Sequence, residues 1–557
     1  MARNRLIYLP LGGAGEIGMN CYVYGYGPKG QERFILVDTG VTFPDMDGTP
    51  GVNLIMADIS WLLERLDRVE AIFITHAHED HIGALGLLYG DLNLPIYVRP
   101  FTAAIARLKL EEHGRRIDAV TEVAPFPETV TAGPFTVGFL PVAHSIPESS
   151  ALVIDTPAGR VVHTGDFKLD HNPVVGEAFD PDSLRKVSDR GVLALVCDST
   201  NVFSPTAGRS ESTLTAPITE LIRGAKGLVV ATTFASNVAR LKTLAQAGVD
   251  AGRSIVVMGR AMKKMIAVAQ ATGILTDFPP TVPQEDAAKI PRDNLMILVT
   301  GSQGERRAGS AQMANGKYNG ITLREGDMFL FSSKTIPGNE VSVNRIVNAF
   351  SEMGVDVVDD CNGLYHVSGH ANRPDLETVH ELLKPKFLIP MHGEHRHLRE
   401  HARIASAKGI ASIIAPNGAM VELSGNAPRI VEHIEAGRRY LDGNVLIGAL
   451  DGIVRDRIRM ALSGHVAVSM VIDEDDEPLG GVWVETHGLP DPSGTEHSLA
   501  ELMEEGIEYQ LQRAGEQVLT SDEALEELIT RAVRKIGQEM VGKRPECRVM
   551  INRLVGG

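Results

Sequence analysis

The chain has few cysteines and no long apolar run, and each absence excludes a class of protein. Only Cys21, Cys197, Cys361 and Cys547 occur among 557 residues, and no two of them form a CxxC pair. Neither a disulfide framework nor a thiolate zinc site is therefore expected. No stretch approaches the roughly 18 uninterrupted apolar residues of a transmembrane helix, and the first residues lack the apolar core of a signal peptide. We expect a cytoplasmic protein with no membrane partner.

The chain also lacks an excess of positive charge. Its 54 basic and 71 acidic residues leave a net charge of −17, which argues against a protein that coats nucleic acid nonspecifically, because that affinity comes mainly from neutralised phosphates. A nuclease is not excluded, since metal ions and a few basic side chains make a local positive channel on an acidic surface. With 43% hydrophobic and 22% charged residues, the composition is typical of a globular protein with several domains.

Histidine and aspartate are concentrated directly after an apolar run, Ala71–Ile74. The next residues include His76, His78, Asp80 and His81. Imidazole and carboxylate groups bind zinc or manganese and leave room for water. A solvated histidine-rich loop is the alternative, but such a loop rarely follows a buried strand. The pattern therefore predicts a catalytic metal site at the end of a strand.

Three further candidate ligands each follow a strand-like run downstream. They are His144, Asp166 and His392. Any one of them alone is more typical of an ordinary loop residue. Together with the first cluster, they indicate that ligands gather at the ends of several strands.

A glycine motif, Gly13–Gly18, fits the GxGxxG pattern of dinucleotide-binding loops. Such a loop must lead into a helix whose first turn holds the pyrophosphate. The residues that follow, Met19–Gly27, are instead β-branched, aromatic and glycine-rich, a composition that favours strand. We predict a tight turn between two strands.

The order HxHxDH, then His, then Asp resembles the metallo-β-lactamase superfamily. Asp38 in LVDTG matches the first motif of that superfamily, an aspartate that orients the metal loop. Asp198 in CDSTN, His370 in HVSGHA and His392 in PMHGE look like motifs A, B and C of the β-CASP nucleases. With its opening Leu11–Asn20 and its C-terminal extension, the chain resembles the bacterial ribonuclease J family along nearly its whole length.

The resemblance implies an α/β fold with an αββα metallo-β-lactamase sandwich in two pieces, residues 1–208 and 366–432. An α/β β-CASP domain, residues 209–365, is inserted between them, and a linker (433–460) precedes a small α/β C-terminal domain (461–557). Since His392 lies beyond the insertion, the chain must return to the first domain to complete the metal site. We expect the site at a domain cleft, where substrate pockets commonly form.

Local patterns predict elements inside the last two domains. In the insertion, strands are expected at residues 227–232, 254–258, 295–300 and 327–331. In the C-terminal domain they are expected at 465–472, 482–486 and 548–551, with two amphipathic helices before the last strand. Thr520 and Glu523 have capping-box spacing for the start of the second helix. The resemblance suggests that this domain supports oligomerisation or RNA retention, and a plain stabilising role is equally open.

The resemblance also implies roles for the candidate residues. His76, His78 and His144 would hold one divalent ion, Asp80, His81 and His392 a second, and Asp166 would bridge the two. Zn²⁺ is the expected metal, with Mn²⁺ or Mg²⁺ as alternatives. His370 would contact the scissile phosphate and help the leaving oxygen, and Asp198 would orient neighbouring ligands. Asp80 is a candidate proton acceptor, although a ligand carboxylate is usually a poor base.

Two loops resemble the family's pocket for a 5′-terminal monophosphate, and plain turns are the alternative. Their residues are Ser236 and Asn237 in one loop and Ser368, Gly369, His370 and Ala371 in the other. Further residues are candidates for lining an RNA channel. They are Ser302, Gln303, Arg306, Arg307 and the run Ser332–Lys334.

We therefore expect a two-metal ribonuclease that degrades single-stranded, 5′-monophosphorylated RNA from its 5′ end in messenger RNA decay and ribosomal RNA 5′-end maturation. Endonuclease activity is open, and a homodimer or homotetramer is expected. One alternative is a small-molecule metallo-hydrolase such as a thioesterase or lactonase, which would not need the inserted domain. A diiron oxygen or nitric oxide reductase would normally bring a flavin domain, and a noncatalytic RNA-binding subunit would have lost ligands.

Overall fold

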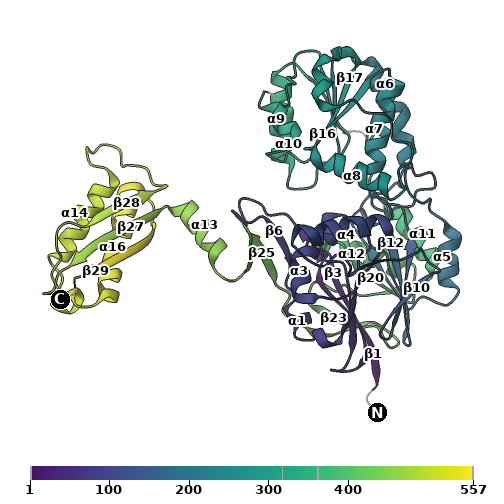
Figure 1. Ribbon diagram of the computed structural model, residues 1–557. Helices are drawn as coiled ribbons and strands as arrows, with labels where there is room; N and C mark the ends of the chain where they lie inside the picture. The colour runs from purple at the N-terminus through teal and green to yellow at the C-terminus, as the bar shows by residue number, and fades with distance from the viewer. Residues whose placement is uncertain (1–2, 317, 361–362, 555–557) are drawn as a thin grey trace. The chain divides into compact units, whose positions relative to one another are not determined.

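The structure is a computed structural model that describes residues 3–316, 318–360 and 363–554 (Figure 1). Its contacts divide the chain into two units. The first runs up to Thr42 and from Met56 to Arg438, and the second comprises Phe43–Ile55 and the residues from Arg439 onward. Within the described ranges, no helix is long and apolar enough to cross a membrane. Cys361 lies outside the described residues, and the other three cysteines are free thiols.

Two β-sheets form the centre of the first unit. In order across the first sheet, its strands are β24 (Arg429–His433), β23 (Ala419–Glu422), β1 (Asn4–Gly12), β3 (Cys21–Pro28), β4 (Arg33–Val37), β7 (Val69–Phe73), β8 (Ile96–Val98) and β9 (Val120–Glu122). Those of the second sheet are β10 (Thr129–Ala132), β11 (Phe135–Pro141), β12 (Ser150–Thr156), β13 (Gly159–His163), β14 (Ala194–Asp198), β20 (Phe387–Met391) and β22 (Ala411–Ser412).

Aromatic and branched side chains join the two sheets in one core. Tyr24 and Phe73 come from the first sheet, and Phe135, Phe139 and Val196 from the second, all fully buried. The rings of Phe73 and Phe139 meet with centroids 6.2 Å apart. Strands with both faces covered are expected to be apolar throughout, and the buried run Phe387–Met391 is an example.

Helices cover the outer faces of both sheets. On the second sheet these are α5 (Pro181–Ser188), α11 (Arg373–Leu383) and α12 (His395–Ala407), which pack through residues such as Leu376 and Ile404. On the first sheet, α4 (Pro100–Glu112) packs against β8 and β9, with α3 (Leu85–Leu92) beside it. This helix–sheet–sheet–helix layering is the αββα sandwich that the resemblance implied, and that prediction is confirmed.

A second α/β layer is inserted between β14 and β20 of the sandwich. Its parallel sheet has the order β16 (Ser254–Met258), β17 (Leu295–Val299), β15 (Val229–Thr232), β18 (Met328–Phe331) and β19 (Asp356–Val358). The four strands predicted here are confirmed to within two residues. Beyond the insertion, β20 pairs in parallel with β14, which sets Asp198 opposite Met391. The chain therefore returns to the second sheet just before His392.

The glycine motif forms the predicted turn. Gly13, Gly15 and Gly18 have φ angles of +81°, +98° and +96°, a region that favours glycine. They lie between the antiparallel strands β1 and β3. No helix follows, so the dinucleotide alternative is excluded here.

The second unit contains a three-stranded sheet with helices against it. Strand β27 (His465–Ile472) lies between β28 (Trp483–His487) and β29 (Glu546–Arg553), and buried residues of α14 (Leu499–Leu511) and α16 (Asp522–Val541) pack on it. All three predicted strands are confirmed. The capping box predicted at Thr520 is wrong, because Thr520 ends the short helix α15 (Glu516–Leu519). Instead, Ser521 caps α16 by accepting a 3.3 Å hydrogen bond from the backbone N–H of Ala524.

The segment Phe43–Ile55 belongs to the second unit, whereas the sequence placed it in the first domain. Asn53 explains the difference. Its backbone N–H donates to the carbonyl of Leu441 at 2.8 Å, and its side-chain oxygen accepts from the N–H of Gly443 at 2.6 Å. These bonds hold the segment against the hairpin of β25 (Arg438–Asp442) and β26 (Val445–Gly448), in the region predicted as linker.

Candidate metal centre

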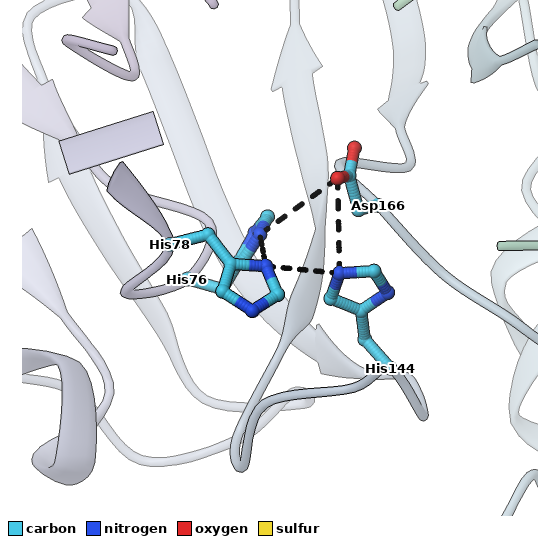
Figure 2. A group of neighbouring side chains, drawn as sticks. All are labelled: His76, His78, His144 and Asp166. Carbon is cyan, nitrogen blue, oxygen red and sulfur yellow. Dashed lines mark hydrogen bonds and ion pairs between the residues drawn. The ribbon is translucent and has the colours of Figure 1, made fainter. Parts of the chain in front are cut away.

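Four of the predicted ligands converge where strands of the two sheets end. His76 and His78 follow β7, His144 follows β11, and Asp166 follows β13. Figure 2 shows the four side chains pointing toward one another. His78 Nδ1 lies 3.2 Å from His76 Nε2 and 3.1 Å from His144 Nε2, while Asp166 Oδ2 is 3.9 Å and 3.7 Å from those two Nε2 atoms.

A second group shares Asp166 with the first. It consists of Asp80, His81 and His392 around the same carboxylate. Asp166 Oδ2 lies 3.3 Å from His81 Nε2, and its Oδ1 lies 3.4 Å from His392 Nδ1. Asp80 Oδ2 is 3.2 Å from His392 Nε2. The structure thus brings all seven predicted ligands together, with Asp166 common to both groups.

The donor set suits divalent cations. Within each group, one ligand atom from every residue lies within 4.8 Å of the others, which is the spread expected for atoms that surround one ion. Imidazole nitrogens that face one another cannot all be satisfied by hydrogen bonds to each other. In the part of the chain that the structure describes, the buried Oδ1 of Asp166 has no hydrogen-bond partner either. A cation between these atoms satisfies both requirements.

The protonation of the imidazoles differs between the two groups. Burial lowers the pKa of His76 and of His144 well below its ordinary value, and neighbouring histidines lower it further. Burial also opposes charge on His392, but Asp166, Asp198 and Asp80 outweigh it and raise that pKa to about 10. The first group therefore presents neutral imidazoles, the form that binds metal. In the second group, protons and metal ions compete for the same imidazole nitrogens.

Asp38 supports the loop that carries His76, His78, Asp80 and His81. Its carboxylate accepts from the N–H and hydroxyl of Thr75 at 2.8 and 2.9 Å, and its Oδ2 lies 2.7 Å from His81 Nδ1. A carboxylate on the far nitrogen of a histidine orients that ring. Both Asp38 and His392 have positive φ angles, +62° and +49°, which non-glycine residues adopt at a cost of about 1–3 kcal/mol. This strained backbone coincides with the candidate site.

Sequence reasoning missed Asn20, which holds the other side of His81. Its Nδ2 lies 2.9 Å from His81 Nε2, and its Oδ1 accepts from the hydroxyl of Tyr22 at 2.6 Å. The loop reaches this place because Gly40 has no side chain. A Cβ on Gly40 would lie 1.7 Å from the carbonyl oxygen of Asp80. Asn20 closes the LGGAGEIGMN motif, so its position next to the glycines was the available signal.

Asp198 and His370, both predicted to be catalytic, are in direct hydrogen-bond contact. Asp198, at the end of β14, has its Oδ2 2.8 Å from His370 Nδ1, and its Oδ1 accepts from the hydroxyl of Thr200 at 2.7 Å. The Thr200 hydroxyl also lies 2.8 Å from His392 Nδ1. Asp198 therefore positions His370 directly and His392 through Thr200.

A buried polar chain joins the three motif segments, and sequence reasoning did not find it. His401 Nδ1 lies 2.9 Å from the hydroxyl of Ser199, and its Nε2 lies 3.1 Å from His380 Nε2. Ser199 belongs to motif A, α11 with His380 begins just after His370, and α12 with His401 begins just after His392. All three side chains are buried. Histidines at helix-core spacing gave no sign that they were partners.

Replacing His401 with phenylalanine is expected to reduce stability by about 2 kcal/mol. The change keeps a flat, slightly larger ring but removes both nitrogens, so Ser199 and His380 lose their partner, and a buried polar group left unpaired costs about 1–3 kcal/mol. Thermal unfolding would measure this, with His487→Phe, an exposed histidine in the second unit, as the control. An unchanged Tm for His401→Phe would show that the chain does not stabilise the fold.

The two predicted phosphate loops are linked by a residue that was not predicted, Arg240. Its backbone N–H donates to Asn237 Oδ1 at 2.9 Å, while its guanidinium donates to the carbonyl of Val367 at 3.3 Å and lies 3.1 Å from His366 Nδ1. Arg240 is fully buried and pairs with Glu211. Asn237 thus caps α7 (Val238–Asp250), and Ser236 beside it is half-buried.

The other loop is engaged with the metal centre. The carbonyl of Gly369 accepts from His144 Nδ1 at 2.6 Å, and the hydroxyl of Ser368 accepts from Asn201 Nδ2 at 2.7 Å. A Cβ on Gly369 would lie 2.9 Å from the His144 ring, so only glycine allows this approach. Ala371 is buried.

Most residues predicted for the RNA channel are buried. Ser302, Gln303, Ser332 and Ser333 are each less than 8% exposed. The Gln303 amide donates to the carbonyl of Lys334 at 3.0 Å and so braces that loop. Arg306, Arg307 and Lys334 remain as the solvent-facing part of the prediction.

Family models match most of the chain. The model described as metallo-beta-lactamase superfamily matches residues 14–195, and that of the ribonuclease J beta-CASP domain matches 226–350. A Zn-dependent metallo-hydrolase RNA specificity domain matches 355–416, and the ribonuclease J C-terminal domain matches 452–554. The four matches follow the chain in the order of the sandwich, the insertion, the return to the sandwich and the second unit.

Several proteins of known name are similar over most of their length. Ribonuclease J of Sinorhizobium meliloti is 39% identical over 554 residues, which cover 99% of this chain and 97% of the relative. Ribonuclease J 1 of Streptococcus pyogenes is 38% identical, over 84% of this chain and 84% of the relative. Ribonuclease J of Mycolicibacterium smegmatis is 34% identical, over 96% of this chain and 95% of the relative. A solved structure of an Enterococcus faecalis protein of unknown function is similar in fold alone, with a TM-score of 0.52 and 17% identity over 75% of this chain and 100% of that one.

Proposed function

This chain belongs to the ribonuclease J family of metal-dependent ribonucleases, and from that premise we propose that it is a 5′-to-3′ exoribonuclease that prefers single-stranded RNA with a 5′-monophosphate. The observation that carries the proposal is the meeting of seven ligand-type side chains with the Asp198–His370 pair in one place. A small-molecule hydrolase would need neither that pair nor the inserted domain.

We infer that the centre holds two divalent ions, one in each ligand group with Asp166 between them. The mixture of imidazole and carboxylate favours zinc and also accepts manganese or magnesium. When bound, two such ions would supply a nucleophile at neutral pH and neutralise charge on the phosphoryl oxygens. Asp38 on Nδ1 would orient His81 so that its Nε2 faces the metal, the place that the amide of Asn20 occupies at 2.9 Å. Thr200 would orient His392.

His370 is the proposed group that contacts the scissile phosphate. Its side chain is 21% exposed, whereas Asp198 behind it is buried. Burial opposes a positive charge on His370, but Asp198 and then Asp166 outweigh that effect and raise its pKa. A protonated His370 donates to the phosphate and to the leaving 3′ oxygen, so the products carry a 5′-phosphate and a 3′-hydroxyl. Asp80, whose pKa is lowered by His81 and His392 despite its burial, is a weaker candidate for accepting a proton.

The preference for 5′-monophosphate ends is assigned to the two phosphate loops. Ser236 and Ser368 offer hydroxyls and Gly369 offers a backbone N–H, the donors expected around a phosphate. Arg240 ties the two loops together, so a 5′ end bound by one is held in a defined place relative to the other. A pocket beside the metal centre would make the enzyme start from 5′ ends. Internal cleavage would occur when RNA reaches the metal centre without placing a 5′ end in the pocket.

We further propose that the enzyme acts in messenger RNA decay and ribosomal RNA 5′-end maturation in the cytoplasm, as a homodimer or homotetramer. The family membership supports these roles. The β27–β29 sheet of the second unit is the candidate for contacts between subunits or for RNA retention.

The test follows a 3′-labelled RNA that carries either a 5′-monophosphate or a 5′-triphosphate, with the protein in Mn²⁺ or Zn²⁺. Rapid loss of the monophosphorylated RNA to mononucleotides is expected, with the triphosphorylated RNA largely intact. Internal cleavage that ignores the 5′ end would retain the ribonuclease and remove the pocket. No cleavage in either metal would contradict the whole proposal.

Replacing Ser368 with alanine is expected to reduce the preference for monophosphorylated RNA by about 10- to 100-fold, since one hydrogen bond to a charged group contributes about 1.5–3 kcal/mol. The Ser368 hydroxyl also accepts from the backbone N–H of His370 at 3.2 Å, so a loss shared by all substrates, including a circular RNA with no 5′ end, would report on the catalytic loop and not on the pocket. The ratio of rates on the two linear substrates measures the effect, and Ser406→Ala, on the surface helix α12, is the control. An unchanged ratio would remove Ser368 from the pocket.

A further inference from the structure

Phe203 is an exposed aromatic residue that the assigned roles leave unexplained. Its side chain is 51% exposed, in the loop that follows Asp198. The loop is held by hydrogen bonds, since the N–H of Ser204 donates to the carbonyl of Asn201 at 2.9 Å. Asn201 Nδ2 in turn donates to Ser368 at 2.7 Å and to the carbonyl of His370 at 3.3 Å. The position of Phe203 is therefore tied to that of the proposed catalytic histidine.

One edge of the ring rests on the segment that carries His392. His397 meets the Phe203 ring edge-on, with centroids 5.3 Å apart and an interplanar angle of 61°. His397 is buried and packs on Gly393, where a Cβ would lie 2.8 Å from the Cβ of His397. His397 thus contacts both the ring and the backbone next to His392. Phe203 is thus linked through His397 to the segment that carries His392, and through its own loop to Asn201 and the His370 loop.

Arg396 places a cation over one face of the ring, which leaves the opposite face for a base. Its guanidinium carbon lies 5.9 Å from the centroid of Phe203, within the range of a cation–π contact. Its side chain is exposed and also pairs with Glu394 at 2.9 Å. An exposed aromatic ring with an arginine beside it is the combination on which unstacked nucleobases rest in proteins that bind single strands.

We propose that Phe203, with Arg396 beside it, is a stacking platform for a nucleobase of the RNA near the scissile phosphate, an inference that rests on the proposed ribonuclease function. The overall charge of −17 limits what phosphate neutralisation contributes to binding, whereas stacking needs no net charge. Every base has a π-face, so a platform of this kind suits an enzyme that degrades RNA of any sequence.

The test compares Phe203→Leu and Phe203→Trp in the full-length protein. Leucine keeps an apolar side chain and removes the ring, and we expect it to raise both the KM and the Kd for single-stranded RNA about tenfold with kcat unchanged. Tryptophan should restore both. The matched control is Tyr509→Leu, which removes an equally exposed ring, 54% exposed with Arg513 at 5.3 Å, in the second unit. It should behave as the wild type.

RNAs in which one nucleotide at a time lacks its base locate the platform. When one particular base near the cleaved bond is missing, the KM and Kd of the wild type should rise about tenfold. The KM and Kd of Phe203→Leu should not change with that RNA. Equal sensitivity of both proteins at every position, or an unchanged KM for Phe203→Leu, would overturn the proposal. So would a change in oligomeric state without a change in KM, which would assign the ring to a protein interface.

Binding measured with EDTA present separates this inference from the proposed function. A wild type that binds RNA through Phe203 but never cleaves it on adding metal would contradict the ribonuclease proposal alone. A wild type that cleaves RNA, with a Phe203→Leu variant that binds and cleaves identically, would contradict the platform alone.

Discussion

Replacing His81 with alanine is expected to lower kcat/KM for RNA cleavage by well over 100-fold and to release metal from the protein. His81 lies next to three carboxylates, with Asp38 at 2.7 Å, Asp166 at 3.3 Å and Asp80 at 3.7 Å. Losing a group that merely orients a ligand costs about 10–100-fold. Losing the imidazole itself removes a ligand and with it the charge of the ion that neutralises the surrounding carboxylates, so the effect should be larger.

Two variants calibrate that result. Asp38→Asn keeps the shape of the group that orients His81 but weakens its hold, and should fall in the range of about 10–100-fold. His433→Ala removes an exposed histidine of β24 and should change neither cleavage nor metal content. Elemental analysis of the purified proteins measures the metal content, and cleavage of 3′-labelled RNA measures the activity. A His81→Ala protein that retains two metals and full activity would contradict the ligand assignment.

Replacing His370 with alanine is expected to lower kcat by about 10²- to 10⁴-fold, the range typical of losing a general acid or base, while metal content stays the same. The reason is that His370 bonds to Asp198 at 2.8 Å and lies outside the two groups that contain the seven predicted ligands. With Asp166, Asp198 and His392 it forms a third group that could hold an ion, so metal content decides between the two roles. KM should change much less than kcat, because the contact is made chiefly in the transition state. A parallel loss of metal would instead make His370 a ligand.

A substrate with sulfur in place of the bridging 3′ oxygen tests the proposed role directly. A thiolate leaves without needing a proton, so a true proton donor becomes dispensable. His370→Ala should then cleave the sulfur-substituted bond at nearly the wild-type rate, whereas His81→Ala should remain inactive on it. If the sulfur substrate does not rescue His370→Ala, His370 does not protonate the leaving group.

Local elements of this fold followed from the order of residues along the chain. The strands at 254–258 and 465–472 were predicted to the residue because runs of branched apolar side chains need a buried sheet. Prediction failed where two local signals competed. Thr520 and Ser521 are both acceptable helix caps, and only the short helix α15, which ends at Thr520, decided that Ser521 would start α16.

The types and order of the ligands were determined by the sequence alone, because imidazole and carboxylate groups after apolar runs have few other uses and matched a family pattern. What only the tertiary structure decided is which groups meet across long stretches of chain. Asn20 reaches His81 because Gly40 lets two backbones approach closely, and His401 reaches Ser199 because α12 packs beside motif A. The loop that carries Phe203 is joined to the His370 loop because Asn201 bonds to the carbonyl of His370. Such contacts depend on packing between segments distant in sequence, and a local pattern of residues contains no record of them.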